Sequence, residues 1–205
     1  MPAQTPFAKV ARTRAFGAKV VLEGRNLNEC EGTVNALIQE HGLTLIHPYD
    51  NELVMMGQGT AGLEMLTDQP DLDILVVPIG GGGLMGGIAT IARDMRPNIK
   101  IYGVQTELYP SMKLAVEGKE ITCGGETLAE GIAVKKPGST TLPVVDALVD
   151  EILLVNEREL EWAVGALIEQ QRVVSEGAGA AGIAAIHANP ALFAGKKVGA
   201  VICGG

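Results

Sequence analysis

Short runs of apolar, largely β-branched residues recur along the chain, each bounded by polar or glycine positions. These runs cover residues 19–24, 43–48, 74–79, 100–105, 151–156 and 197–203. Most of them are continuously apolar, which is typical of parallel strands covered on both faces, whereas strands with one wet face alternate apolar and polar residues. We therefore expect a mainly parallel sheet built from these segments.

Between the apolar runs, hydrophobic residues recur at helical spacing. The expected helices cover residues 5–17, 26–42, 51–67, 84–95, 157–173 and 176–188. The first two end at a glycine, and Thr5 and Pro6 suit the cap and the first turn of the first helix. Strands that alternate with helices predict a doubly wound α/β fold. A boundary is expected near residues 47–50, dividing the chain into regions 1–50 and 51–205.

Four successive glycines, Gly80 to Gly83, lie between the expected strand 74–79 and the expected helix 84–95. In α/β folds, ligands bind at the carboxyl ends of strands, beside the N-terminus of the next helix. A backbone without Cβ atoms can direct several N–H groups at one anion, and the first helical turn adds further unpaired N–H groups. The loop is therefore predicted to bind a phosphate group. A flexible turn or close packing of helix on strand is the alternative.

The loop alone does not identify the phosphate ligand. Gly81, Gly83 and Gly86 fit the G-x-G-x-x-G pattern of dinucleotide-binding domains, and Glu107 follows the next strand, about where a ribose-binding acid would lie. A P-loop is excluded, because no Lys-Ser or Lys-Thr pair follows the glycines. Dinucleotides and other phosphate ligands both remain open on this evidence.

Composition narrows the class of partner. The 205 residues carry a formal net charge of -8 and scattered basic residues, which argues against nucleic acid or an anionic membrane as partner. No apolar stretch approaches membrane-spanning length, and the first ten residues lack the order of a signal peptide. Cys30, Cys123 and Cys203 form no CxxC pair, and such a sparse set suits a reducing compartment. We expect a cytoplasmic protein that acts on a small molecule.

Five separated segments carry a family resemblance in their order and spacing. They are residues 9–24, 57–66, 127–138, 174–186 and 197–205. Together with the glycine loop they resemble the pyridoxal-phosphate (PLP) enzymes of fold type II, in particular the threonine ammonia-lyases, also called threonine dehydratases, and the related serine racemases. The resemblance covers essentially the whole chain. It implies that residues 1–50 are a remnant of the small, substrate-side domain and residues 51–205 a large PLP-binding domain, truncated at its C-terminal end.

The resemblance also implies which residues bind the cofactor. The implied cofactor-binding residues are Gly80, Gly81, Gly82, Gly83, Leu84, Gly131, Glu176 and Cys203. The glycines and Leu84 would hold the phosphate, Gly131 would lie beside the ring through its backbone, and Glu176 would lie near the cofactor. Cys203 stands where the family places a Ser or Cys against the pyridine nitrogen. Such a neutral partner leaves that nitrogen largely unprotonated, which favours β-elimination over long-lived carbanions.

The implied reaction converts L-threonine or L-serine to a 2-oxo acid and ammonia, in the case of threonine to 2-oxobutanoate. In the family, the lysine that holds PLP covalently precedes everything present here, and the family continues beyond Gly205. The resemblance thus implies a partial chain of a homo-oligomeric enzyme, with no catalytic residue of its own. Lys135 and Lys136 are poor substitutes, because a KKPG sequence is typical of an exposed turn. A non-catalytic fragment that binds PLP or phosphate, and a dinucleotide-binding domain, are the alternatives.

No metal is expected. Serine racemases bind a divalent cation through a Glu, a backbone carbonyl and an Asp just after the strand that matches residues 100–105. The matching positions here are Gln105, Tyr109 and Ser111, and Glu107 is offset from the pattern. Hard cations prefer carboxylate oxygens, which these positions do not supply.

Overall fold

The computed structural model describes residues 1–204, except for the side chains of residues 27 and 28. The chain forms two compact units, Met1–Ile46 and His47–Gly205. The division falls at the amino end of the boundary expected near residues 47–50. The assignment of the two regions as small and large domains stays a prediction.

The first unit contains two helices, α1 (Phe7–Ala15) and α2 (Leu27–His41), within the two segments expected to be helical. The cap predicted for α1 is wrong, because Pro6 takes the cap position and the Thr5 hydroxyl donates to the Pro2 carbonyl (2.7 Å). The C-terminal end of α2 is as expected, since Gly42 adopts the left-handed conformation (φ 62°) that favours glycine.

The strands predicted at residues 19–24 and 43–48 do not form in the described part of the first unit. A strand needs a neighbouring strand to satisfy its backbone groups. Residues 21–24 form hydrogen bonds with the first residues of the chain, for example from the Glu23 amide to the Met1 carbonyl (3.0 Å), and with Cys30 Sγ, which donates to the Glu23 carbonyl (3.0 Å). In the second segment, Leu45 and Ile46 are exposed. Both segments are apolar, but neither has a neighbouring strand to pair with among the described residues of this unit.

The second unit is built on a four-stranded parallel sheet with the order β3-β2-β1-β4. The strands are β1 (Ile74–Pro78), β2 (Lys100–Thr106), β3 (Glu151–Val155) and β4 (Val198–Ala200). All four lie where the sequence predicts strands, but β4 is shorter than the run 197–203. The amide of Val201 still donates to the Val76 carbonyl (3.1 Å), and Pro78, which has no N–H, then interrupts the ladder on this side of β1.

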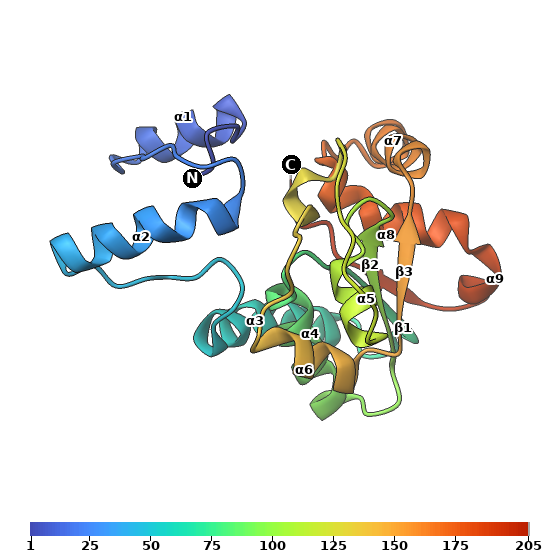
Figure 1. Cartoon of the computed structure of the whole chain (residues 1–205). Coiled ribbons are helices and arrows are strands. Elements are labelled where there is room, and N and C mark those ends of the chain that lie inside the picture. The colour runs from blue at the N-terminus through green and yellow to red at the C-terminus, as the bar shows by residue number, and fades with distance from the viewer. Residues whose placement is uncertain (205) are drawn as a thin grey trace. The chain divides into compact units, whose positions relative to one another are not determined.

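Helices cover both faces of the sheet, which gives three layers (Figure 1). On one face, Ile74 and Val76 of β1 pack with α7 (Glu157–Ala166) and α8 (Gly177–Ala188). The alternate residues of β1 pack on the other face, with α3 (Glu52–Asp68), α4 (Gly83–Met95) and α6 (Thr141–Leu148). This arrangement confirms the predicted α/β class with a parallel sheet.

The remaining short elements of the second unit are α5 (Ser111–Val116), a 3-10 turn η1 (Glu130–Ile132), a π-helical turn η2 (Leu167–Gln171) and α9 (Pro190–Phe193). The helix expected over residues 157–173 therefore changes its hydrogen bonding after Ala166, and Arg172 ends η2 in the left-handed conformation (φ 59°). Helix α6 has no counterpart among the expected helices. None of the helices in residues 1–204 combines the length and apolarity needed to cross a membrane.

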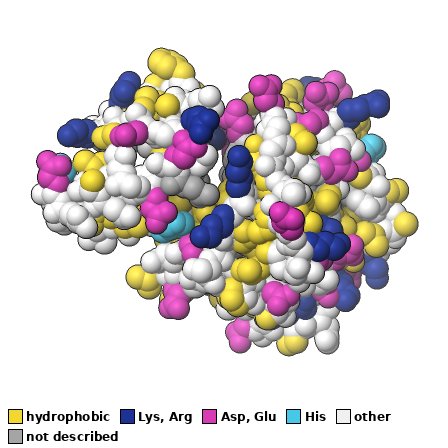
Figure 2. Space-filling view, viewed as in Figure 1, with side chains coloured by type: hydrophobic (Ala, Val, Ile, Leu, Met, Phe, Trp, Pro, Cys, Tyr) yellow, Lys and Arg dark blue, Asp and Glu magenta, His cyan; other side chains and the backbone are white. Residues whose placement is uncertain are grey.

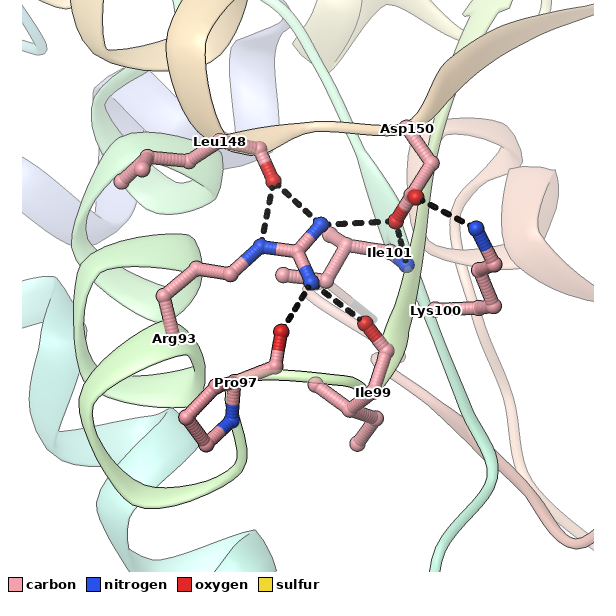
Figure 3. Close-up of polar contacts among 7 residues, drawn as sticks. All are labelled: Arg93, Pro97, Ile99, Lys100, Ile101, Leu148 and Asp150. Carbon is pink, nitrogen blue, oxygen red and sulfur yellow. Dashed lines mark hydrogen bonds and ion pairs between the residues drawn. The ribbon is translucent and has the colours of Figure 1, made fainter.

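An ionic cluster ties α4 to the amino ends of β2 and β3 (Figure 3). The Arg93 guanidinium donates to the carbonyls of Leu148, Pro97 and Ile99 and to the carboxylate of Asp150, at 2.7–3.0 Å. Asp150 also accepts hydrogen bonds from Lys100 Nζ and from the Ile101 amide, both at 2.8 Å. The cluster therefore holds the amino ends of the strands in place, whereas the glycine loop follows the carboxyl end of β1.

On the face of the molecule seen in Figure 2, acidic and basic side chains are interspersed, without a large patch of one sign.

Candidate functional site

The glycine loop follows β1, the strand that lies between β2 and β4 in the sheet. Helix α4, which leaves β1, packs on one face of the sheet, and α8, which precedes β4, packs on the other face. The chain connections therefore diverge at the carboxyl end of β1, and such a switch point is where open α/β sheets bind ligands. Gly80 to Gly83 thus lie at the strand-to-helix junction that the sequence predicts.

The main-chain amides of this loop have no hydrogen-bond acceptor within the part of the chain that the structure describes. Within residues 1–204, no hydrogen-bond acceptor lies in range of the amides of residues 80–85, and the first helical bond runs from the Gly86 amide to the Gly82 carbonyl (2.8 Å). Gly81, Gly82 and Gly83 are nevertheless buried. A buried N–H without an acceptor costs about 1–3 kcal/mol. An anion with several oxygen acceptors, such as a phosphate group, fits this set of donors.

The loop also needs glycine for steric reasons. Gly82 has a φ of 99°, and a Cβ atom there would lie 2.6 Å from Met112 Cε and 2.7 Å from Thr141 Oγ1. A Cβ atom on Gly81 would overlap the ring of Tyr49. Close packing, the alternative from the sequence, is therefore real, but it leaves the unpaired amides unexplained. The glycines are therefore needed both for close packing and for an anion site.

The segments that carry the other predicted site residues, Gly131, Glu176 and Cys203, lie close to one another beside the loop. A Cβ atom on Gly80 would lie 3.4 Å from the Gly131 carbonyl oxygen, and one on Gly131 would lie 3.0 Å from Glu176 Oε1. The Glu176 amide donates to the Gly204 carbonyl (3.1 Å), next to Cys203. The structure thus brings together segments that are far apart in the sequence. Their role as cofactor contacts stays a prediction, as does that of the half-buried Leu84 in the first turn of α4.

The surroundings of the Cys203 thiol favour its neutral form. Its Sγ donates to the Ala178 carbonyl at 3.9 Å. Partial desolvation raises the pKa of the Cys203 thiol, a main-chain hydrogen bond opposes this, and the Glu176 carboxylate adds to the rise in pKa. A protonated thiol at neutral pH is the uncharged group that the resemblance requires at this position.

We expect iodoacetamide to alkylate Cys203 several-fold more slowly at pH 7 than it alkylates free cysteine, because fewer of these thiols are ionised. The rate should still be rising with pH where the rate of free cysteine has levelled off, because the Cys203 thiol becomes fully ionised only at a higher pH. Peptide mapping by mass spectrometry separates Cys203 from Cys30 and Cys123. Alkylation at pH 7 as fast as that of free cysteine would contradict the raised pKa.

The three positions that match the metal site of serine racemases are engaged in hydrogen bonds within the chain. Gln105 Oε1 accepts from the Lys113 amide (3.0 Å), and Ser111 Oγ donates to the Val134 carbonyl (2.6 Å). The Tyr109 hydroxyl donates to a main-chain carbonyl at 2.8 Å. Among the described residues, no three His, Cys, Asp or Glu side chains come close enough to hold a metal ion. That the protein needs no metal stays a prediction.

Three residues that shape the loop, Tyr49, Asp50 and Thr141, were not predicted from the sequence. Tyr49 covers Gly81, and its hydroxyl donates to the Lys136 carbonyl (3.2 Å). Thr141 is fully buried beneath the loop. The only available signal was the Gly-Ser-Thr-Thr stretch before an apolar run, which is typical of a helix start. Lys135 and Lys136 are exposed, as expected of a KKPG turn.

Comparison with known proteins extends over the whole chain. A family model described as pyridoxal-phosphate dependent enzyme matches residues 1–204. The chain is 45% identical over 207 residues to the L-threonine ammonia-lyase of Thermotoga maritima, covering 100% of this chain and 51% of that protein. It is 43% identical over 210 residues to the catabolic L-threonine dehydratase of Staphylococcus aureus, covering 100% of this chain and 61% of that protein. The chain thus spans little more than half the length of these relatives.

Solved structures of enzymes with related names are also similar to this chain over nearly its whole length. The processed form of threonine deaminase isoform 2 from Solanum lycopersicum superposes with a TM-score of 0.90 at 33% identity, covering 100% of this chain and 57% of that one. Maize serine racemase superposes with a TM-score of 0.90 at 31% identity, covering 97% of this chain and 63% of that one.

Proposed function

Because the chain belongs to the pyridoxal-phosphate-dependent enzyme family, we propose that it is the cofactor-binding part of a threonine or serine ammonia-lyase. The parent enzyme would convert L-threonine to 2-oxobutanoate and ammonia. The observation that carries this proposal is the set of unpaired amides of residues 80–85, at the carboxyl end of the central strand β1. The names of the relatives, threonine ammonia-lyase and threonine dehydratase, support the substrate class.

The residues beside β1 suit the different parts of the cofactor. The amides of residues 80–85 and the positive end of the α4 dipole would bind the phosphate. Gly131, exposed and without a side chain, would let the ring approach the backbone. Cys203 Sγ would hold its own proton and face the pyridine nitrogen as a neutral group, because partial desolvation, with a smaller contribution from Glu176, raises the pKa of that thiol. When bound, PLP supplies the electron sink for loss of the α-proton and of the β-hydroxyl group.

Two alternatives make different predictions. A non-catalytic chain would bind PLP or phosphate without taking part in a reaction. A dinucleotide-binding domain would use the same loop together with Glu107, which is exposed after β2. The family match favours PLP over a dinucleotide. Cytoplasmic location and assembly into a homo-oligomer belong to the same proposal, and the three free cysteines are consistent with a reducing compartment.

Addition of PLP to the purified chain tests the proposal. We expect saturable, noncovalent uptake that dialysis reverses, because the resemblance places the covalent lysine outside these residues. Pyridoxal, which lacks the phosphate, should bind at least about tenfold more weakly, since the loop amides then have no anion to bind. Borohydride should fix no PLP at a unique lysine, as checked by mass spectrometry.

The controls separate the alternatives. Equal affinity for pyridoxal and PLP would contradict a phosphate site at the loop. Tight binding of NAD without any response to PLP would favour the dinucleotide-binding domain. Turnover of L-threonine after the N-terminal part of a threonine ammonia-lyase is supplied as a separate polypeptide would distinguish a lyase from a non-catalytic binding chain.

A further inference from the structure

The carbonyl oxygen of Gly81 is bound by two donors beneath the glycine loop. The Thr141 hydroxyl donates to it at 2.6 Å, and the Gly138 amide donates to it at 3.1 Å. Thr141 is fully buried, and Gly138 is buried as well. This short hydrogen bond therefore lies in an environment where water does not compete for either partner.

The bound carbonyl fixes the direction of the next amide. No cis peptide bond occurs in the described chain, and in a trans peptide the C=O and the following N–H point in opposite directions. Since the Gly81 carbonyl points at Thr141, the Gly82 N–H points away from Thr141, to the side of the loop where no protein acceptor lies among the described residues. A peptide between two glycines can turn over easily, because neither residue has a Cβ atom to restrict it.

The segment that carries Thr141 is itself held in place. The Asp50 carboxylate accepts hydrogen bonds from the Ser139 amide (2.8 Å), the Ser139 hydroxyl (2.9 Å) and the Thr140 amide (2.7 Å). The Asp50 amide in turn donates to His47 Nδ1 at 2.8 Å. Asp50 therefore clamps the start of α6, and Thr141 is presented to Gly81 from a fixed support.

We propose that Thr141 is a positioning residue, which orients the Gly81–Gly82 peptide so that the Gly82 amide is available to a phosphate group. This role rests on the proposed function for its ligand, but the orientation itself is a property of the ligand-free chain. Thr141 acts through the main chain and would not touch the cofactor.

Two substitutions at this position separate the hydroxyl from the shape of the side chain. Thr141→Val keeps the volume and removes the donor, whereas Thr141→Ser keeps the donor. Thr67→Val is the matched control, because the Thr67 hydroxyl also donates to a main-chain carbonyl (Leu63, 2.7 Å) but lies on the exposed part of α3. All variants are compared as the full 205-residue chain, with thermal unfolding recorded for each.

The first readout needs no ligand. In amide proton–nitrogen correlation spectra, Thr141→Val should shift or split the signals of Gly82 and its loop neighbours, while Thr141→Ser and Thr67→Val should retain the wild-type signals. The second readout is the dissociation constant for PLP and for inorganic phosphate. We expect Thr141→Val to weaken both by about tenfold or more, with the serine variant restoring most of the affinity.

The two readouts distinguish this role from the proposed function. Unchanged loop signals in Thr141→Val would overturn the positioning role, even if the wild-type chain binds PLP. Altered loop signals in a chain whose wild type binds neither PLP nor phosphate would support the positioning role and contradict the proposed function. A loss of affinity that serine does not restore would also overturn the role assigned to the hydroxyl.

Discussion

Replacement of Gly82 by alanine is expected to lower the free energy of unfolding by about 2–5 kcal/mol and to abolish saturable binding of PLP. Two effects add at this position. The φ of 99° is unfavourable for a residue with a side chain, and the new methyl group would meet Met112 Cε and Thr141 Oγ1 at 2.6 and 2.7 Å. Relief of these contacts must move the loop and with it the amides of residues 80–85. Urea unfolding and PLP titration measure the two outcomes.

Gly118→Ala is the matched control for this substitution. Gly118 also has a positive φ (65°), but no atom lies within 4 Å of the position that its Cβ would take. The control should therefore lose only the conformational part of the stability, about 1–2 kcal/mol, and should bind PLP normally. A Gly82→Ala chain that unfolds like the control and still binds PLP would contradict the packing described for the loop.

Replacement of Arg93 by alanine is expected to destabilise the chain by about 2–3 kcal/mol without changing the affinity for PLP. The guanidinium satisfies the carbonyls of Leu148 and Ile99 and pairs with Asp150, so its removal leaves acceptors at the amino edge of the sheet without their donor. Lys100→Ala is the control, because Lys100 is largely exposed and its replacement removes only an ion pair with Asp150. Equal unfolding midpoints for the two variants would contradict a central role for Arg93.

Through Asp150, the same cluster makes the free energy of unfolding depend on pH in the acid range. Burial raises the pKa of the Asp150 carboxyl, but hydrogen bonds from Lys100, from the Ile101 amide and from Arg93 outweigh burial and lower that pKa below its ordinary value. A carboxyl with a lowered pKa in the folded state stabilises the fold above its unfolded-state pKa, and this contribution is lost as the pH falls through the folded-state pKa. The stability difference between wild type and Asp150→Asn should therefore be constant near neutral pH and shrink in acid.

The sequence predicted the fold correctly where neighbouring strands and helices bury the apolar residues of a segment. The runs that became β1, β2 and β3 are apolar on both faces and are covered by helices on both sides, so the pattern and the structure agree. The pattern does not specify a partner strand, and for this reason the runs at 19–24 and 43–48 were wrongly expected to be strands. It also did not reveal that the missing N–H of Pro78 would shorten β4.

The candidate site was predictable where its chemistry lies in the main chain. Four glycines between a strand and a helix indicate an anion site from first principles, whereas the positions of Gly131, Glu176 and Cys203 came only from the family resemblance. Thr141 could not be found in this way. A threonine at a helix start is common, and only the fold reveals that its hydroxyl lies 2.6 Å from the Gly81 carbonyl, sixty positions away in the sequence.

The unpaired amides of residues 80–85 link the melting behaviour of the chain to its ligand. A ligand that binds only the folded chain adds RT ln(1 + [L]/Kd) to the free energy of unfolding, about 2.7 kcal/mol at a hundredfold excess over Kd. The melting temperature of the chain should thus climb with the logarithm of the PLP concentration. Because a protease cleaves the transiently unfolded chain, added PLP should also slow digestion of the purified chain by a protease.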